Sequence, residues 1–205
     1  MTSLADRVAG CERCGLAHVR QRAVAGDCPA GATVLLIAAA PSFPAELVGR
    51  ALSDEAREVL VAAGVDMATV ATTTLVKCRP PAGRTPTEDE IAACRPFLEE
   101  QVAEQLPETV VALGGPVLRS LAPGAPPLST SHGHSRPITI GEHEARLLPV
   151  LDPYAIAEVP SLAPLLAADH GGPAPVAPAT PAAAPDVAPA EEPEPSEAPP
   201  QLGLF

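Results

Sequence analysis

The chain has 205 residues, a length that suits one domain of ordinary size plus an additional segment. Its formal net charge of −12 at pH 7 excludes a broad basic surface for coating nucleic acid, so any contact with DNA must be weak and local. No apolar run reaches the roughly 18 residues of a membrane helix, and residues 1–10 lack the apolar core of a secretory signal. We therefore expect a soluble cytoplasmic monomer without membrane contact, in which the five cysteines are metal ligands or free thiols.

The first half of the chain alternates between predicted strands and helices. Ala32–Ala40 is a continuous apolar run ending at Pro41, which indicates a buried strand followed by a loop. Ser53 is a helix cap, and the helix that it opens is predicted to end near Ala63. Val70–Val76 is rich in β-branched residues and predicts a second strand. Such alternation is typical of a mainly parallel sheet covered by helices on both faces.

The second half continues this pattern up to about residue 168. Thr87 and Glu90 form a capping box, which opens a helix predicted to end near Leu106. The remaining predicted elements are a strand Val110–Leu113, a short helix from Pro116, an edge strand Pro137–Ile140, a core strand Leu147–Leu151 and a helix Tyr154–Ala168. We expect a three-layer α/β/α sandwich with a mainly parallel four-stranded sheet and with its functional residues at the carboxyl ends of the strands.

The composition changes sharply at residues 171–172. Residues 172–200 are rich in proline, alanine and glutamate and contain no basic residue, which predicts an extended, disordered linker. The chain therefore divides into a folded domain (1–171), a linker (172–200) and a short apolar peptide (201–205).

Four cysteines have a spacing that suggests a metal centre. Cys11 and Cys14 form a CxxC pair, Cys78 follows the second predicted strand, and Cys94 lies on the long predicted helix. Four thiolates suit either zinc or a 4Fe-4S cluster, and buried cysteines acting as small apolar side chains are the alternative. Zinc sites more often use two close pairs, whereas here one close pair accompanies two distant single cysteines.

Two segments, CERCGL and LVKCRPPAGRTPTEDEIAACRPFLEEQ, resemble the family 4 uracil-DNA glycosylases. The resemblance covers about residues 8–168 and includes the LVGRA segment (47–51). It implies a uracil-DNA glycosylase-like fold, activity on N-glycosidic bonds in DNA repair, and a 4Fe-4S cluster rather than zinc. The cluster ligands that it implies are Cys11, Cys14, Cys78 and Cys94. Cys28 is left over and is predicted to be a free thiol.

The chain departs from the family at the residues that carry the chemistry. Ala39 replaces an acid that positions the attacking water, and Leu47 replaces a Phe that stacks on uracil. Thr74 replaces an Asn that reads the uracil edge, and a hydroxyl cannot reproduce the paired donor and acceptor of an amide. Asp152 replaces a His that donates a hydrogen bond to the departing base. A carboxylate there would oppose the developing negative charge.

A wedge residue and an Arg near DNA are also replaced, by Ala157 and Glu158. We therefore predict a catalytically weak or inactive iron-sulfur protein associated with DNA repair or replication. Two alternatives remain open. One is an active DNA glycosylase with altered lesion specificity that uses Asp152 or Glu46 as its acid, and the other is a cluster-based redox sensor.

Other polar residues have less specific interpretations. His132 and His134, in the sequence His-Gly-His, could bind phosphate or metal. Because no matching carboxylate or cysteine spacing accompanies them, we expect these two and His143 to be solvated loop residues. Lys77, Arg79 and Arg84 flank the third cysteine and could either contact a DNA backbone or balance the charge of a cluster.

The last five residues, QLGLF, resemble the peptide with which bacterial proteins bind the DNA sliding clamp. In such a peptide Leu202, Leu204 and Phe205 would occupy an apolar pocket, and Gln201 would fix the orientation through hydrogen bonds. A flexible linker before the peptide raises its effective concentration at a second site. The resemblance thus implies a clamp-recruited bacterial protein, located at the nucleoid when bound to DNA.

Overall fold

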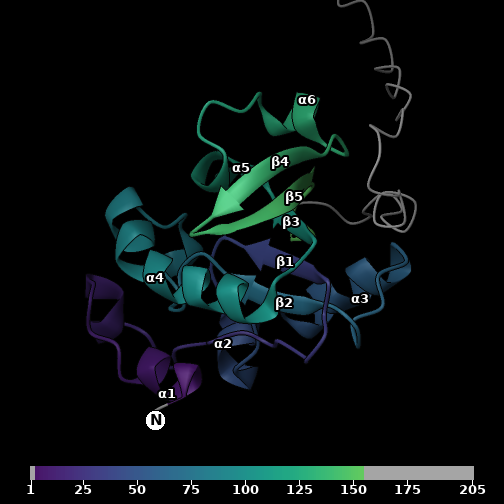
Figure 1. Ribbon diagram of the computed structural model, residues 1–205. Coiled ribbons are helices and arrows are strands. Elements are labelled where there is room, and N and C mark those ends of the chain that lie inside the picture. The colour runs from purple at the N-terminus through teal and green to yellow at the C-terminus, as the bar shows by residue number, and fades with distance from the viewer. Residues whose placement is uncertain (1–2, 155–205) are drawn as a thin grey trace, which may run out of the picture.

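The structure, a computed structural model, describes residues 3–154. Its elements in chain order are α1 (Leu4–Ala9), η1 (Gly15–His18), β1 (Val34–Ala38), α2 (Phe43–Val48), α3 (Asp54–Ala62), β2 (Ala71–Thr74), η2 (Pro81–Gly83), α4 (Glu88–Gln105), β3 (Thr109–Leu113), α5 (Gly115–Leu121), α6 (Leu128–Ser131), β4 (Arg136–Ile140) and β5 (His143–Val150). Figure 1 shows the strands at the centre, with α4 and α3 on different sides of the sheet.

The sheet contains five strands in the order β2-β1-β3-β5-β4. The first four are parallel, as predicted, and β4 pairs antiparallel with β5, with Ile138 opposite Ala145. The predicted number of four strands is therefore one too low. The reason is local, because a tight turn at Gly141, whose φ is 62°, joins β4 and β5 into a hairpin, and β5 consequently begins at His143 rather than Leu147. The edge position of β4 also tolerates Pro137.

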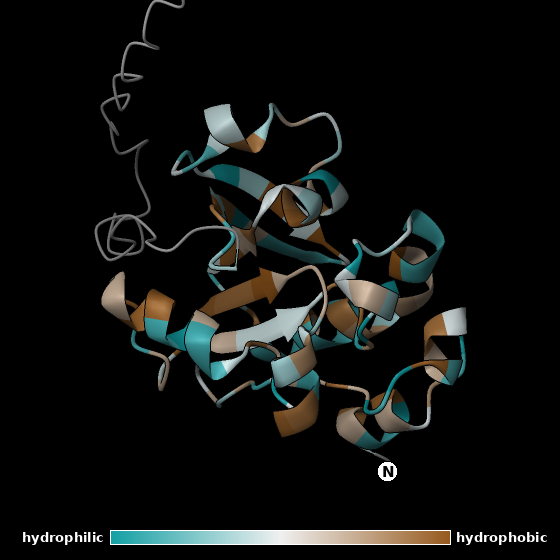
Figure 2. Ribbon diagram, turned by 180° about the vertical axis from the view of Figure 1, so that it is seen from behind, coloured by the Kyte–Doolittle hydropathy of each residue, from teal (hydrophilic) through white to brown (hydrophobic). Residues whose placement is uncertain are grey.

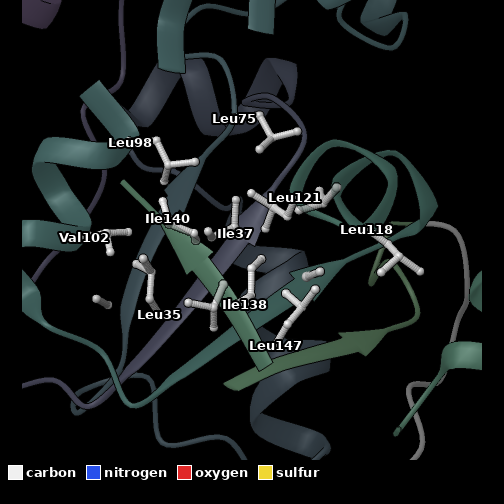
Figure 3. Packing of buried hydrophobic residues seen from close by; sticks show 14 of the residues in the cluster. Leu35, Ile37, Leu75, Leu98, Val102, Leu118, Leu121, Ile138, Ile140 and Leu147 are labelled. Carbon is white, nitrogen blue, oxygen red and sulfur yellow. The ribbon is translucent and has the colours of Figure 1, made fainter. Parts of the chain in front are cut away.

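Buried side chains on the two faces of the sheet build two separate cores. Leu35 and Ile37 of β1 point toward a core formed with α4 and α5, and labelled members of this core are seen in Figure 3. Leu36 and Ala38 point to the opposite face, where they pack with α3. Because successive strand residues alternate between faces, a wholly apolar β1 must be covered on both sides. The three-layer α/β/α arrangement is thus confirmed.

The hydropathy colouring agrees with this layering. Figure 2 shows a brown, hydrophobic strand at the centre beside a nearly white one, and the surrounding helices carry both brown and teal segments. None of the helices within residues 3–154 has the length and apolarity to cross a membrane.

Local capping explains where the helices begin. The capping box at Thr87 is present, with the Thr87 side chain accepting from Glu90 N, and α4 ends at Gln105 close to the predicted end. The segment after Pro41, predicted to be a loop, contains α2 instead. Its cap is Ser42, whose Oγ accepts from Ala45 N at 3.3 Å. The predicted helix Tyr154–Ala168, the linker and the terminal peptide fall outside the described residues, apart from Tyr154.

Candidate functional site

The four predicted ligands, Cys11, Cys14, Cys78 and Cys94, all line one small pocket, here called the cysteine pocket. The first two lie between α1 and η1, the third follows β2, and the fourth is on α4. Figure 1 shows this purple amino-terminal segment below α4. The rest of the lining is mainly apolar and includes Val8, Leu16, Val76 and Phe97. The fold therefore brings together four thiols that are spread over 83 positions of the chain, from Cys11 to Cys94.

Two N–H groups donate hydrogen bonds to sulfur atoms of this pocket. Arg20 Nη1 lies 3.2 Å from Cys78 Sγ, and the backbone N of Lys77 lies 3.2 Å from Cys94 Sγ. Burial raises the pKa of both thiols, while these donors act in the opposite direction. A metal centre would therefore have to displace thiol protons, and the N–H donors would then stabilise the thiolates.

A single zinc ion and a 4Fe-4S cluster require different arrangements of four sulfur atoms. Within residues 3–154, no group of three or more His, Cys, Asp or Glu side chains is arranged to hold one metal ion, although all four cysteines line the same pocket. A single zinc ion at about 2.3 Å from each sulfur would draw four sulfurs around one point. In a 4Fe-4S cluster each thiolate binds a different iron, so the sulfurs stay farther apart. The four thiols and the mainly apolar lining match the donor set that a 4Fe-4S cluster uses.

Cys28 does not line the cysteine pocket. It lies near Gln101, whose Nε2 is 3.7 Å from Cys28 Sγ, and it packs against the core beneath α4. Burial raises the pKa of its thiol, which keeps it protonated at neutral pH. Cys28 therefore lies apart from the four cysteines that line the cysteine pocket.

A second, larger depression lies at the carboxyl ends of the parallel strands, and we call it the strand-end groove. It encloses about 1020 Å³ of space open to solvent. Its walls are the loop after β1, the segment after Cys78, the start of α5 and the residues after β5, and they include Ala39, Phe43, Arg79, Arg84, Asp152 and Tyr154. The position agrees with the general rule that open α/β sheets bind ligands beyond the carboxyl ends of their strands.

Two of the replaced family positions, Ala39 and Asp152, lie in the lining of this groove. Asp152 Oδ1 accepts from the backbone N of Tyr154 at 2.9 Å. Burial raises the pKa of the Asp152 carboxyl, and this hydrogen bond opposes the rise. Gly114, with a φ of 88°, allows the close approach, since a Cβ there would lie 3.1 Å from the Cβ of Asp152.

Thr74 and Leu47 are not part of the lining, and the replaced positions Ala157 and Glu158 lie outside the described residues. Thr74 ends β2, is fully buried, and its Oγ1 has no hydrogen-bond partner among the described residues. Leu47 lies on α2 with 51% of its surface exposed. The groove therefore places only Ala39 and Asp152 where they could act on a bound group.

Glu46, the second predicted acid, has a structural position. Its side chain is fully buried, with Oε2 2.7 Å from Arg79 Nε and Oε1 2.9 Å from the backbone N of Gln21. Burial opposes ionisation of Glu46, but the hydrogen bonds from Arg79 and from the backbone N atoms of Gln21 and Arg22 together hold its pKa below the usual value. Glu46 is absent from the lining of the groove and anchors Arg79 there.

Sequence reasoning missed Phe43. Its ring is half exposed in the strand-end groove, and the guanidinium carbon of Arg79 lies 5.3 Å from the ring centroid. Phe43 precedes Leu47 by one helical turn of α2. The available signal was composition, because the chain has only three Phe and one Tyr, and two of these four rings, Phe43 and Tyr154, line the groove.

The basic residues near the third cysteine separate into two groups. Lys77 is buried inside the fold. Arg79 and Arg84 line the groove, where each also pairs with a carboxylate, Glu46 and Glu90 respectively. The Arg84 hydrogen bonds lower the pKa of Glu90 to about 2.

The three histidines, of which His143 begins β5, do not join either site. His143 Nε2 lies 2.9 Å from the carbonyl oxygen of Pro107. Burial, with a smaller contribution from nearby His134, lowers the pKa of His132. None of the three lines the cysteine pocket or the strand-end groove.

Comparison with known proteins agrees with this architecture. The family model described as the uracil DNA glycosylase superfamily matches residues 25–178. Curated relatives named type-4 uracil-DNA glycosylase include that of Saccharolobus solfataricus, 35% identical over 116 residues, which are 54% of this chain and 54% of the relative. The protein of Pyrobaculum aerophilum is 33% identical over 118 residues (56% and 60%), and that of Thermotoga maritima is 32% identical over 128 residues (60% and 67%).

The chain spans about half the length of the first of these curated relatives. The family match itself extends over most of the sequence and covers β1 to β5, the groove walls and two of the four pocket cysteines, Cys78 and Cys94. With the predicted parallel sheet, the four-cysteine pocket and the strand-end groove all present, the chain belongs to the uracil DNA glycosylase superfamily.

Proposed function

We propose that this protein is an iron-sulfur member of the superfamily that binds DNA in repair or replication and excises uracil weakly or not at all. One observation carries the proposal: Ala39 and Asp152 are the residues that line the strand-end groove where the resemblance places a water-positioning acid and a hydrogen-bond-donating histidine. Both changes act on the same step, the cleavage of the bond to the base.

The chemistry of that step explains the expected loss. A methyl side chain at Ala39 offers no oxygen that could orient a water molecule. An ionised Asp152 is only an acceptor, so it would repel the negative charge that develops on a departing base. A protonated Asp152 could donate, but its ordinary pKa lies near 3.9 and only burial raises it here.

The cofactor in this proposal is a 4Fe-4S cluster bound by Cys11, Cys14, Cys78 and Cys94. Such a cluster supplies a cross-link between distant segments and a one-electron couple. The chain's own contribution is a dry pocket and two N–H donors to sulfur, from Arg20 and from the backbone of Lys77.

Contact with DNA would be confined to the strand-end groove. Arg79 and Arg84 provide positive charge there in a chain whose net charge is −12. Phe43 offers an aromatic face, and stacking of a base on such a ring is sequence-tolerant. This arrangement suits a single-stranded or flipped nucleotide better than a long duplex.

The test is excision of uracil from single-stranded DNA by the anaerobically purified holoprotein. We expect little product from the natural sequence and a clear gain from the double variant Ala39→Glu, Asp152→His, which restores both groups named above. The single variants are the matched controls and should gain less. Robust excision by the unaltered protein would refute the proposal.

A second candidate function is favoured by the accessibility of Asp152. Its Oδ1 is engaged by Tyr154 N, whereas the carboxyl as a whole faces the groove. Of the two acids considered for an altered glycosylase, Asp152 lines the groove and Glu46 does not. The test is release of damaged bases from a panel of DNA substrates. The natural protein should release at least one base other than uracil, and Asp152→Asn should abolish that release. No release by the natural protein would refute this second function.

Recruitment to a sliding clamp is proposed from the sequence of the terminal peptide alone, since Gln201, Leu202, Leu204 and Phe205 lie outside the described residues. The experiment is a binding assay between the holoprotein and a bacterial clamp, with and without residues 201–205. Loss of binding on truncation would support the proposal, and equal binding would refute it.

A further inference from the structure

Lys77, the only lysine in the chain, is almost completely buried, with 1% of its surface exposed. Its Nζ donates to Thr73 Oγ1 at 2.6 Å, to the carbonyl oxygen of Thr74 at 2.8 Å and to Gln101 Oε1 at 2.6 Å. All three partners accept hydrogen bonds. Because an ammonium group has three N–H donors and no acceptor, this set of partners matches the charged form of the side chain.

No carboxylate balances this charge among the described residues, since every ion pair found there involves an arginine. Taking a cation out of water without an opposite charge costs several kcal/mol in real proteins. Within residues 3–154, no acidic side chain therefore provides the anion that would complete this electrostatic arrangement.

Lys77 also borders the cysteine pocket. Lys77 is part of the lining of that pocket, its backbone N donates to Cys94 Sγ, and Cys78 follows it directly in the chain. A 4Fe-4S cluster with four thiolate ligands carries net negative charge, so occupation of the pocket supplies the missing anion.

We infer that Lys77 is the built-in counter-charge of the cluster and sets its reduction potential. A fixed cation beside the centre favours the form with one more electron, so it raises the potential. The inference rests on the proposed cluster. Lys77 is a positioning residue in this sense, because its Nζ donates hydrogen bonds to Thr73, Thr74 and Gln101 and is not a ligand of the cluster.

The experiment measures the potential of the anaerobic holoprotein by a reductive titration with dithionite, which supplies the electron, followed by electron paramagnetic resonance. Lys77→Gln and Lys77→Met both remove the charge, but only Gln keeps a hydrogen-bond donor. Both variants should shift the potential to more negative values by similar amounts. Cys28→Ala is the control for a change beside Gln101 that leaves the charge in place, and it should leave the potential unchanged.

A second readout is the rate at which a chelator removes iron from the same holoproteins. Loss of the counter-charge should shorten the half-life of the cluster several-fold in both Lys77 variants and leave Cys28→Ala like the natural protein. An unmoved potential in either iron-loaded Lys77 variant overturns the inference, as does a shift confined to Met, which would reflect lost hydrogen bonding. Natural protein that contains no iron overturns the proposed cluster and this inference together.

Discussion

The buried pair of Glu46 and Arg79 provides a quantitative test of how the strand-end groove is held in shape. The Glu46 side chain is fully buried and the Arg79 side chain is 20% exposed. Replacing Glu46 with Ala would leave a largely buried guanidinium and the backbone N atoms of Gln21 and Arg22 without their acceptor. Removal of one partner from a buried ion pair typically costs about 3 to 5 kcal/mol.

This cost can be read as a change in the thermal midpoint of the holoprotein. For a chain of 150 to 250 residues, 1 kcal/mol corresponds to about 2 to 4 °C, so Glu46→Ala should lower the midpoint by about 6 to 20 °C. The matched control is Arg50→Ala, which removes an exposed pair with Asp54 and should cost less than about 1 kcal/mol. Circular dichroism under anaerobic conditions measures both. If the two variants melt alike, Glu46 does not anchor Arg79 as described.

Three further predictions concern the groove and the cysteine pocket. Phe43→Ala should weaken binding of a short single-stranded DNA, measured by fluorescence anisotropy, by the roughly 1 to 3 kcal/mol typical of one stacked base, whereas Leu47→Ala should have little effect because Leu47 is absent from the groove lining. Because burial raises the folded-state pKa of Asp152, the protonated carboxyl stabilises the fold at low pH, and this contribution is lost as pH rises from the unfolded pKa through the raised one. Asp152→Asn should remove that pH dependence from the thermal midpoint, and an unchanged profile would assign it to another group. Elemental analysis should find no bound iron in Cys94→Ser, whereas Cys28→Ala should retain its iron. Equal iron contents in the two variants would exclude Cys94 as a ligand.

Local sequence patterns were sufficient for most of the secondary structure. The apolar run of β1, the capping box of α4 and the parallel sheet were all predicted from periodicity and caps, which act within a few residues. The short helix α2 was not predicted, because a proline directly after a strand also suits a loop. In the structure Ser42 follows Pro41 and caps the helix. The edge strand Pro137–Ile140 was predicted, but its antiparallel pairing with β5 across the Gly141 turn was not, because periodicity does not report which strands pair.

The candidate site also has features that sequence suggests and features that depend on packing. The four cysteines that spacing and resemblance suggest as ligands line one pocket. Ala39 and Asp152, which the resemblance places at catalytic positions, both line the strand-end groove. Sequence could not show that Phe43 lines the groove while Leu47, one turn later on the same short helix, does not, because the orientation of that helix is set by packing.

What the sequence by itself determined was therefore the identity of the groups: four thiols, a missing acid and a carboxyl in place of a histidine. What only the tertiary structure decided was which charges have partners. Glu46 is bound to Arg79, while Lys77 is buried beside the cysteine pocket with no carboxylate partner among residues 3–154. The physical reason is that charge interactions depend on distance and burial in three dimensions, and residues 33 positions apart, such as Glu46 and Arg79, become neighbours only when the sheet has formed.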